Sequence, residues 1–203
     1  LGYCPNEFSE NISGIENQLS SGTLTFQAAI LIPGSRLMAL KGHHLTKMRF
    51  ACTEGVSNIY AWARYDLKST VINNRPTKVG TAKAGWNEVT FVEPIEITGK
   101  DLYVGYNGKV PAGGAIYCDG VSNPNGNFFY DGSAWANFTN YGYDPLCIQV
   151  VAEISGDLPL NDLAVEKCTF ANPYTRIGDN VSATISINNY GEKEVDIPAM
   201  HYS

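Results

Sequence analysis

The sequence is poor in the features that mark several large classes of protein. Its 14 basic and 20 acidic residues are spread along the chain and give a net charge of −6. Because binding to phosphates needs clustered cations, we expect no nucleic-acid partner. No apolar stretch approaches the roughly 20 residues that cross a bilayer, so we also expect no membrane span.

The motifs of common catalytic and metal sites are missing as well. There is no CxxC pair, Cys/His cluster, Walker loop, GxSxG elbow or HExxH helix. A cysteine nucleophile needs a neighbouring histidine, yet His43 and His44 follow a glycine in an expected turn and His201 lies in the tail. The sequence therefore predicts a protein that is not an enzyme and has no metal site.

The cysteines are odd in number, and two of them lie in apolar alternating runs. Cysteine in such runs is usually a small buried hydrophobe, and one disulfide somewhere in the chain is the alternative. The start of the sequence lacks a charged region followed by an apolar one, so we expect a cytosolic protein or a signal peptide already removed. The five cysteines are Cys4, Cys52, Cys118, Cys147 and Cys168.

What the sequence does contain is a series of short runs in which apolar and polar residues alternate, as in β-strands. In one run Met48, Phe50 and Cys52 are predicted to point inward. Pairs such as Asn107-Gly108 and Asp119-Gly120 predict tight turns. The predicted strands are 24–32, 45–52, 59–65, 87–92, 102–106, 115–118, 127–131 and 146–154, with a helical turn at 35–40.

These runs predict an all-β protein: a jelly-roll-like β-sandwich followed by a partial immunoglobulin-like β domain. We expect the sandwich at 1–155, a linker at 156–161 and the incomplete domain at 162–203. Three strands in that last segment, the last of them at 195–202, cannot close an immunoglobulin-like sandwich of roughly 100 residues. The rest of a longer polypeptide, or a second copy, is expected to complete it.

Three segments resemble a known family. They are LTKMRFAC (45–52), GWNEVTFVEPIEITGKDLYVGY (85–106) and GSAW (132–135). They are similar to β-sandwich modules of secreted and surface proteins of Bacteroides and Porphyromonas relatives, including the cleaved-adhesin domains attached to gingipain-type proteases. The tail NDLAVEKCTF, with GDNVSATISINNYGEKEV, resembles the opening strands of a CARDB-like immunoglobulin domain.

This resemblance implies a jelly-roll-like first domain, export to the cell surface or the extracellular space, and a role in adhesion or carbohydrate binding. Some relatives bind calcium in a jelly-roll loop. No DxDxD-like run of ligands occurs here, so no cofactor is predicted and calcium occupancy is left open. Residues 1–23 match no pattern of the family.

The candidate ligand site lies in the segment 117–143, which mixes aromatic and amide side chains. Sugar rings present apolar faces beside hydroxyl groups, so flat aromatic rings and hydrogen-bonding groups suit them. The best candidates are Tyr130, Asp131 and Trp135, with Asn125 and Asn127 as supporting amides. The alternative is that the aromatics pair within two hairpins while the asparagines serve the turns.

Trp62 is a further candidate, because Tyr60, Trp62 and Arg64 share one face of their strand. These residue types suit a sugar surface, but they are also enriched at protein interfaces. For this strand we favour packing or a domain interface over a ligand site.

The expected function is a non-catalytic, exported surface module that binds glycans or adheres to host or surface proteins. The alternative is a structural spacer or accessory domain of a larger secreted protein. A ligand site would leave Trp135 or Trp62 exposed, whereas a spacer would bury both. A glycoside hydrolase is the remote alternative, because turn chemistry accounts for the carboxylates of Asp119, Asp131 and Asp144.

Overall fold

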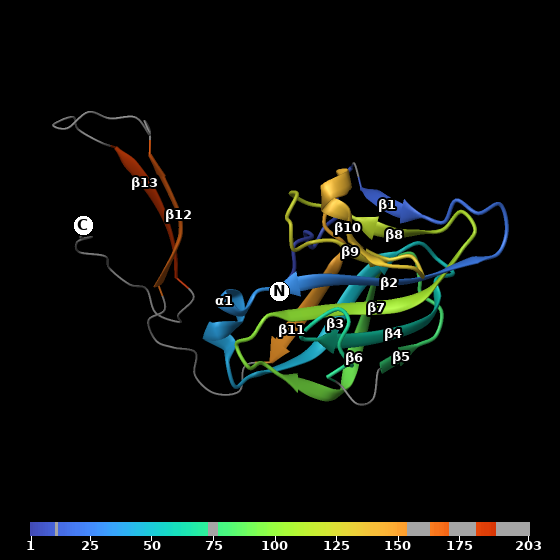
Figure 1. Ribbon diagram of the computed structural model, residues 1–203, viewed down its shortest axis with the longest axis horizontal. Coiled ribbons are helices and arrows are strands. Elements are labelled where there is room, and N and C mark those ends of the chain that lie inside the picture. The colour runs from blue at the N-terminus through green and yellow to red at the C-terminus, as the bar shows by residue number, and fades with distance from the viewer. Residues whose placement is uncertain (11, 73–76, 154–162, 171–181, 190–203) are drawn as a thin grey trace. The chain divides into compact units, whose positions relative to one another are not determined.

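The chain divides into two compact units, Leu1–Glu153 and Ile154–Ser203. The first contains two antiparallel β-sheets, and the described part of the second contains a pair of strands (Figure 1). This arrangement confirms the predicted all-β sandwich class, while the finer jelly-roll and immunoglobulin-like assignments stay predictions. The computed structural model describes residues 1–10, 12–72, 77–153, 163–170 and 182–189.

One sheet of the first unit has six strands in the order β10-β9-β2-β7-β4-β5. Its centre is formed by β2 (Thr23–Ile32) and β7 (Leu102–Pro111), which pair along their whole length. The flanking strands are β4 (Ser57–Arg64), β5 (Thr77–Val79), β9 (Phe128–Tyr130) and β10 (Trp135–Asn137).

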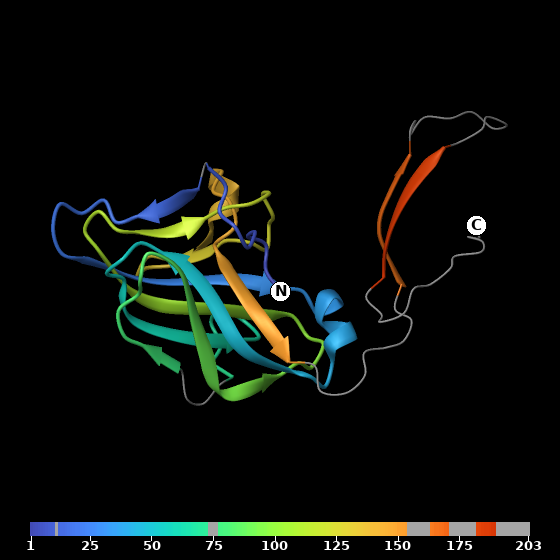
Figure 2. The same ribbon diagram turned by 180° about the vertical axis from the view of Figure 1, so that it is seen from behind.

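The other sheet has five strands and is organised around β3 (His44–Cys52). Both β6 (Gly85–Glu96) and β11 (Ile148–Glu153) pair with β3, and Figure 2 shows these strands side by side. At its last residue β3 also pairs with β8 (Ala115–Cys118), whose other partner is β1 (Ser13–Glu16).

The expected helical turn at 35–40 is present as α1 (Gly34–Leu37) and η1 (Met38–Leu40). Pro33 is the N-cap residue of α1, with an extended backbone, and its carbonyl accepts from the Arg36 amide at 2.9 Å. The Gly34 amide donates to Asp101 Oδ1 at 2.7 Å, and the Leu37 side chain is buried against the core. A second 3-10 turn, η2, covers Phe138–Tyr141.

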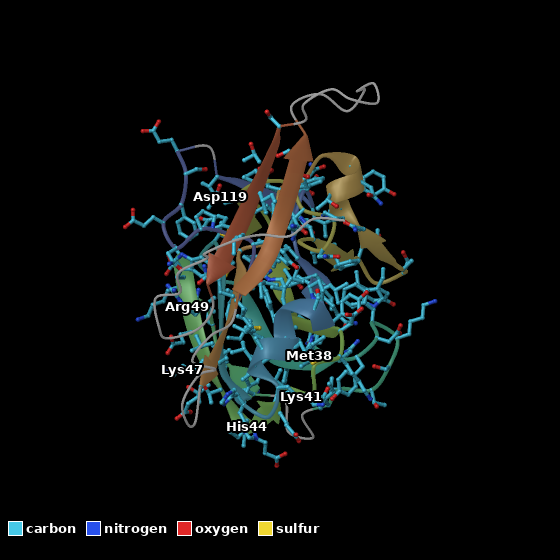
Figure 3. The ribbon with its side chains drawn as sticks, turned by 90° about the vertical axis from the view of Figure 1, so that its left-hand side faces the viewer. Met38, Lys41, His44, Lys47, Arg49 and Asp119 are labelled. Carbon is cyan, nitrogen blue, oxygen red and sulfur yellow. The ribbon has the colours of Figure 1, made fainter. Side chains whose placement is uncertain are left out.

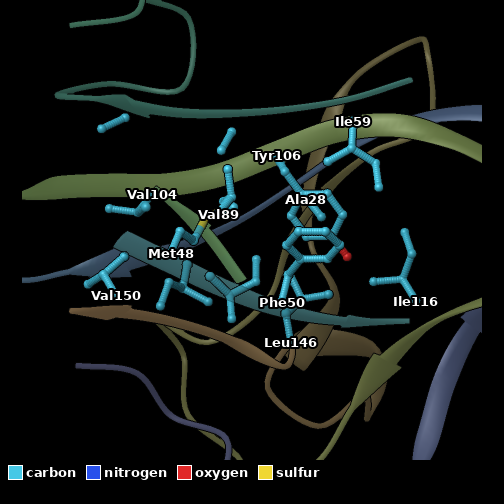
Figure 4. Packing of buried hydrophobic residues seen from close by; sticks show 14 of the residues in the cluster. Ala28, Met48, Phe50, Ile59, Val89, Val104, Tyr106, Ile116, Leu146 and Val150 are labelled. Carbon is cyan, nitrogen blue, oxygen red and sulfur yellow. The ribbon is translucent and has the colours of Figure 1, made fainter. Parts of the chain in front are cut away.

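Aromatic side chains from the two sheets meet in the core. The rings of Phe50 on β3 and Tyr106 on β7, which face each other in Figure 4, are 4.5 Å apart. Phe26 on β2 meets Tyr106 edge-on at 5.3 Å. Met48, Phe50 and Cys52 are all fully buried, so their predicted inward orientation is confirmed. Alternation along β3 therefore fixes which face of that sheet meets the other.

The turn predicted at Asn107-Gly108 is wrong, because both residues lie inside β7. Gly108 serves close packing: a Cβ there would come within 3.2 Å of the Phe26 ring and 3.0 Å of the Ser57 carbonyl oxygen. At Asp119-Gly120 the expected turn backbone is present, with Gly120 at φ 114°.

The sequence patterns did not indicate β1, β5 or β10. These strands have four, three and three residues, and they lack the apolar runs that marked β8 and β9, which have the same lengths. The second unit contributes β12 (Leu163–Phe170) and β13 (Ala183–Asn189), which pair antiparallel. The predicted linker at 156–161 and the last predicted run at 195–202 lie outside the described residues.

Tyr106→Phe tests the packing of the core. The Tyr106 hydroxyl is buried and has no hydrogen-bond partner among the described residues. Since a buried unpaired hydroxyl costs free energy, its removal is expected to raise the free energy of unfolding by up to about 1 kcal/mol, measured by urea denaturation.

Tyr3→Phe is the matched control. The Tyr3 hydroxyl donates to the Leu31 carbonyl at 2.7 Å, so its loss is expected to lower the free energy of unfolding by about 1 kcal/mol. Equal losses in the two variants would show that the Tyr106 hydroxyl is paired in solution.

Candidate functional site

The outer face of the six-stranded sheet carries a line of aromatic and polar side chains. Strand register places them directly opposite one another, one from each strand. All are half-buried except the lysine at the end, which is exposed. We call this line the cross-sheet row: Trp135 (β10), Tyr130 (β9), Gln27 (β2), Asn107 (β7), Tyr60 (β4) and Lys78 (β5).

Trp62 lies next to the row on β4 and faces the same side. Its ring meets that of Trp135 edge-on at 6.1 Å, although β4 and β10 are four places apart in the sheet. In a flat sheet such strands would lie about 19 Å apart. The short ring distance therefore means that the sheet is concave on its outer face, which brings side chains of β4 and β10 together.

Gly105 lies beside Trp62 in the sheet and is required there. It pairs with Trp62 on one side and Ala29 on the other, and a Cβ at Gly105 would lie 2.8 Å from that of Ala29. The missing side chain allows the close approach of β2 and β7 at this point. Only 1% of Trp62 is exposed, so this ring forms the base of the face and offers little surface of its own.

Arg64 covers the Trp62 ring and links it to the row. Its guanidinium carbon lies 4.1 Å from the Trp62 ring centroid, a cation–π contact. Nη2 donates to Gln27 Oε1 at 3.2 Å, and Nη1 donates to the Leu67 carbonyl at 3.0 Å. Burial lowers the pKa of Arg64 from its usual value. At the centre of the face, the Arg64 guanidinium thus lies over the Trp62 ring and beside the Gln27 amide.

Tyr130 and Trp135, two of the candidates chosen from sequence, lie together. Their rings are 5.6 Å apart, and both are half-buried. The Tyr130 hydroxyl donates to the Gly132 carbonyl at 3.0 Å. The neighbouring Asp131 is exposed and accepts from Ser133 N at 2.9 Å and Ser133 Oγ at 2.7 Å, which lowers the pKa of its carboxyl group. Asp131 therefore stabilises the β9–β10 turn.

The two asparagine candidates lie elsewhere. Asn127 is fully buried, and its Nδ2 donates to the Asp144 carbonyl at 2.8 Å. Asn125 is half-buried, and its carbonyl accepts from the Leu31 amide at 2.9 Å. Asn127 holds the loop in place, and its burial does not fit a ligand-contacting amide.

Sequence reasoning did not select Gln27 and Asn107, the two amides that the structure places between the aromatic residues. Each stands between buried neighbours on its strand, so alternation indicates that it faces outward. Their position beside Tyr130 depends on the pairing of β2 with β7 and β9, which no local pattern specifies.

The Asp119 carboxylate (labelled in Figure 3) is occupied by hydrogen bonds, most of them from the N-terminal segment. Asp119 is only 4% exposed and accepts from the Ser9 amide and the Ser9 hydroxyl, both at 2.7 Å. The Gly120 amide donates to the same carboxylate at 2.8 Å. Turn chemistry therefore accounts only for the Gly120 bond, whereas the two bonds from Ser9 tie Asp119 to the N-terminal segment. Across the described residues, no group of three or more His, Cys, Asp and Glu side chains is placed to hold a metal ion.

Cys52 and Cys118 are fully buried, as the sequence predicted. Burial raises the pKa of each thiol to about 12, so neither forms the thiolate that a nucleophile requires at neutral pH.

No family model matches this chain, and comparison with curated proteins and with solved structures gives no significant match. The structure shows an all-β sandwich with aromatic side chains on one outer face, and the family of the chain stays a prediction. In the part of the chain that the structure describes, no helix has the length and apolarity needed to cross a membrane.

Arg64→Ala tests whether the Arg64 side chain shields the Trp62 ring from solvent. Removing the guanidinium should expose the indole, increase quenching of tryptophan fluorescence by acrylamide, and lower the free energy of unfolding by about 1–2 kcal/mol. Lys78→Ala is the control, because Lys78 lies at the exposed end of the row, 5.9 Å from the Tyr60 ring. Unchanged quenching in Arg64→Ala would contradict the geometry.

The buried thiols give a prediction with a pH dependence. Because the folded-state pKa of Cys52 and Cys118 is about 12 against an ordinary 9.0, both should resist a thiol reagent at pH 8 until the protein unfolds. Their contribution to stability is complete below pH 9 and decreases as the pH rises from 9 toward 12. Native-state labelling as fast as that of a free thiol would contradict this burial.

Proposed function

We propose that the first unit is a non-catalytic module of an exported surface protein that binds glycans, and that the cross-sheet row is its ligand face. The observation that carries the proposal is that Tyr130 and Trp135 lie together and are both partly exposed. The polar groups of Gln27 and Arg64 lie on the same concave face.

Each part of this face has a chemical role toward a sugar. The Trp135 and Tyr130 rings can stack on the apolar C–H face of a pyranose. The amides of Gln27 and Asn107 can donate to and accept from ring hydroxyls. Arg64 adds a fixed cation, which favours a sugar carrying a carboxylate or sulfate over a neutral one.

A structural spacer is the second candidate, and the burial of Trp62 favours it. The partial exposure of Trp135 favours a ligand face. Glycoside hydrolysis receives no support from Asp119 or Asp131, since hydrogen-bond donors of the protein itself occupy both carboxylates.

A glycan array tests the proposal directly. The purified chain, folded and monomeric, is applied with and without a calcium chelator. We expect selective binding that Trp135→Ala weakens at least about tenfold, because this substitution removes a stacking ring. Loss of binding with chelator would add a structural metal ion to the site.

Tyr141→Ala is the matched control. Tyr141 is an aromatic residue of η2 that is 72% exposed and lies outside the cross-sheet row, so binding should be unchanged. A blank array from folded protein, or equal losses in the two variants, would reject the row as a glycan site and favour the spacer.

A further inference from the structure

The residues before β1 form a strap across β11 and the end of β8, and we define the N-terminal strap as residues 1–10. Leu1 and Val150 exchange two backbone hydrogen bonds of 2.7 Å, and Gly2 bridges to Gln149. The pairing is antiparallel, so each step forward along the strap is a step back along the partner. Two further steps bring Cys4 to the level of Cys147.

The side chains of Cys4 and Cys147 meet at that level. Cys4 is 6% exposed and Cys147 is 1% exposed, and with Ala51 they form a small buried cluster. Their sulfur atoms are 2.7 Å apart. Other sulfur contacts in this unit are longer, 3.6 Å from Cys118 to Asn127 Nδ2 and 4.0 Å from Cys52 to Asn87 Nδ2.

Several contacts hold the strap in this position independently of the cysteines. Gln149 Nε2 donates to the Cys4 carbonyl and to Asn6 Oδ1, each at 3.0 Å. The Phe8 ring stacks on Trp86 at 5.4 Å, and Trp86 lies in turn under the guanidinium of Arg49 at 4.8 Å. Arg49 is labelled in Figure 3. The two thiols are therefore presented to each other by a fixed backbone.

We propose that Cys4 and Cys147 form a disulfide that fastens the N-terminal strap to the sheet. A disulfide needs sulfur atoms at about 2.05 Å, so the pair has to approach by only about 0.7 Å. The two thiols release two protons and two electrons, and the Sγ–Sγ bond forms. The electrons reduce the disulfide of an oxidant, either glutathione or a thiol oxidoreductase, to two thiols, which take up the protons.

Such oxidants act in extracytoplasmic compartments, so this bond agrees with export and does not depend on glycan binding. Contact with Cys4, together with burial, raises the pKa of Cys147 in the folded protein. Because exchange requires a thiolate, formation and reduction of the bond should both proceed while the strap is open.

Thiol counting tests the proposal on the whole chain. The protein is equilibrated with oxidised and reduced glutathione, unfolded without reductant, and labelled with a maleimide. We expect three labels instead of five, since 5 − 2 = 3, and a crosslinked pair of peptides that contains Cys4 and Cys147. Five labels, or a crosslink between any other pair, would overturn the proposal.

Thermal unfolding with and without reductant gives a second readout. Reductant should lower the Tm of the parent chain by about 5–15 °C and leave the Cys4→Ala, Cys147→Ala double variant unchanged. Cys52→Ala, another fully buried cysteine, should keep the full response to reductant. An equal response in the parent and the double variant overturns the proposal, and if the double variant does not fold, the peptide map decides alone.

Discussion

The rings of Phe50 and Tyr106 meet between the two sheets at 4.5 Å, and both are fully buried. This contact sets the orientation of β3 and β7, because side chains alternate along a strand. Once Tyr106 points into the core, Gly105 and Asn107 must face outward. Packing of the core therefore determines which side chains of β7 form part of the proposed ligand surface.

The outer face combines groups that come from distant parts of the sequence. Gln27, Arg64 and Trp135 are brought together only because β2, β4 and β10 belong to one curved sheet. Trp62 supports them from below and is itself kept from solvent by Arg64. A change in the register of β7 would separate these groups, even though none of them lies on β7.

Alternation in the sequence predicted the long strands and the inward residues Met48 and Phe50, because burial of one face leaves a period of two. It did not predict the role of Gly108, since a glycine needed for close packing has the same local sequence as a glycine needed for a turn. Tyr130 and Trp135 were chosen from the composition of their segment, and the structure places their rings together. The burial of Asn127 depends on a loop fold that its neighbours in sequence do not specify.

The N-terminal strap occupies the edge of β11 that β3 leaves free, through the hydrogen bonds between Leu1 and Val150. An uncovered strand edge offers unpaired amide and carbonyl groups on which another chain can add a strand, and this is a common start of aggregation. Proteolytic removal of the strap would create such an edge beside the exposed Val151 side chain. The first few residues of this chain thus cover a strand edge that would otherwise be open to pairing with another copy of the chain.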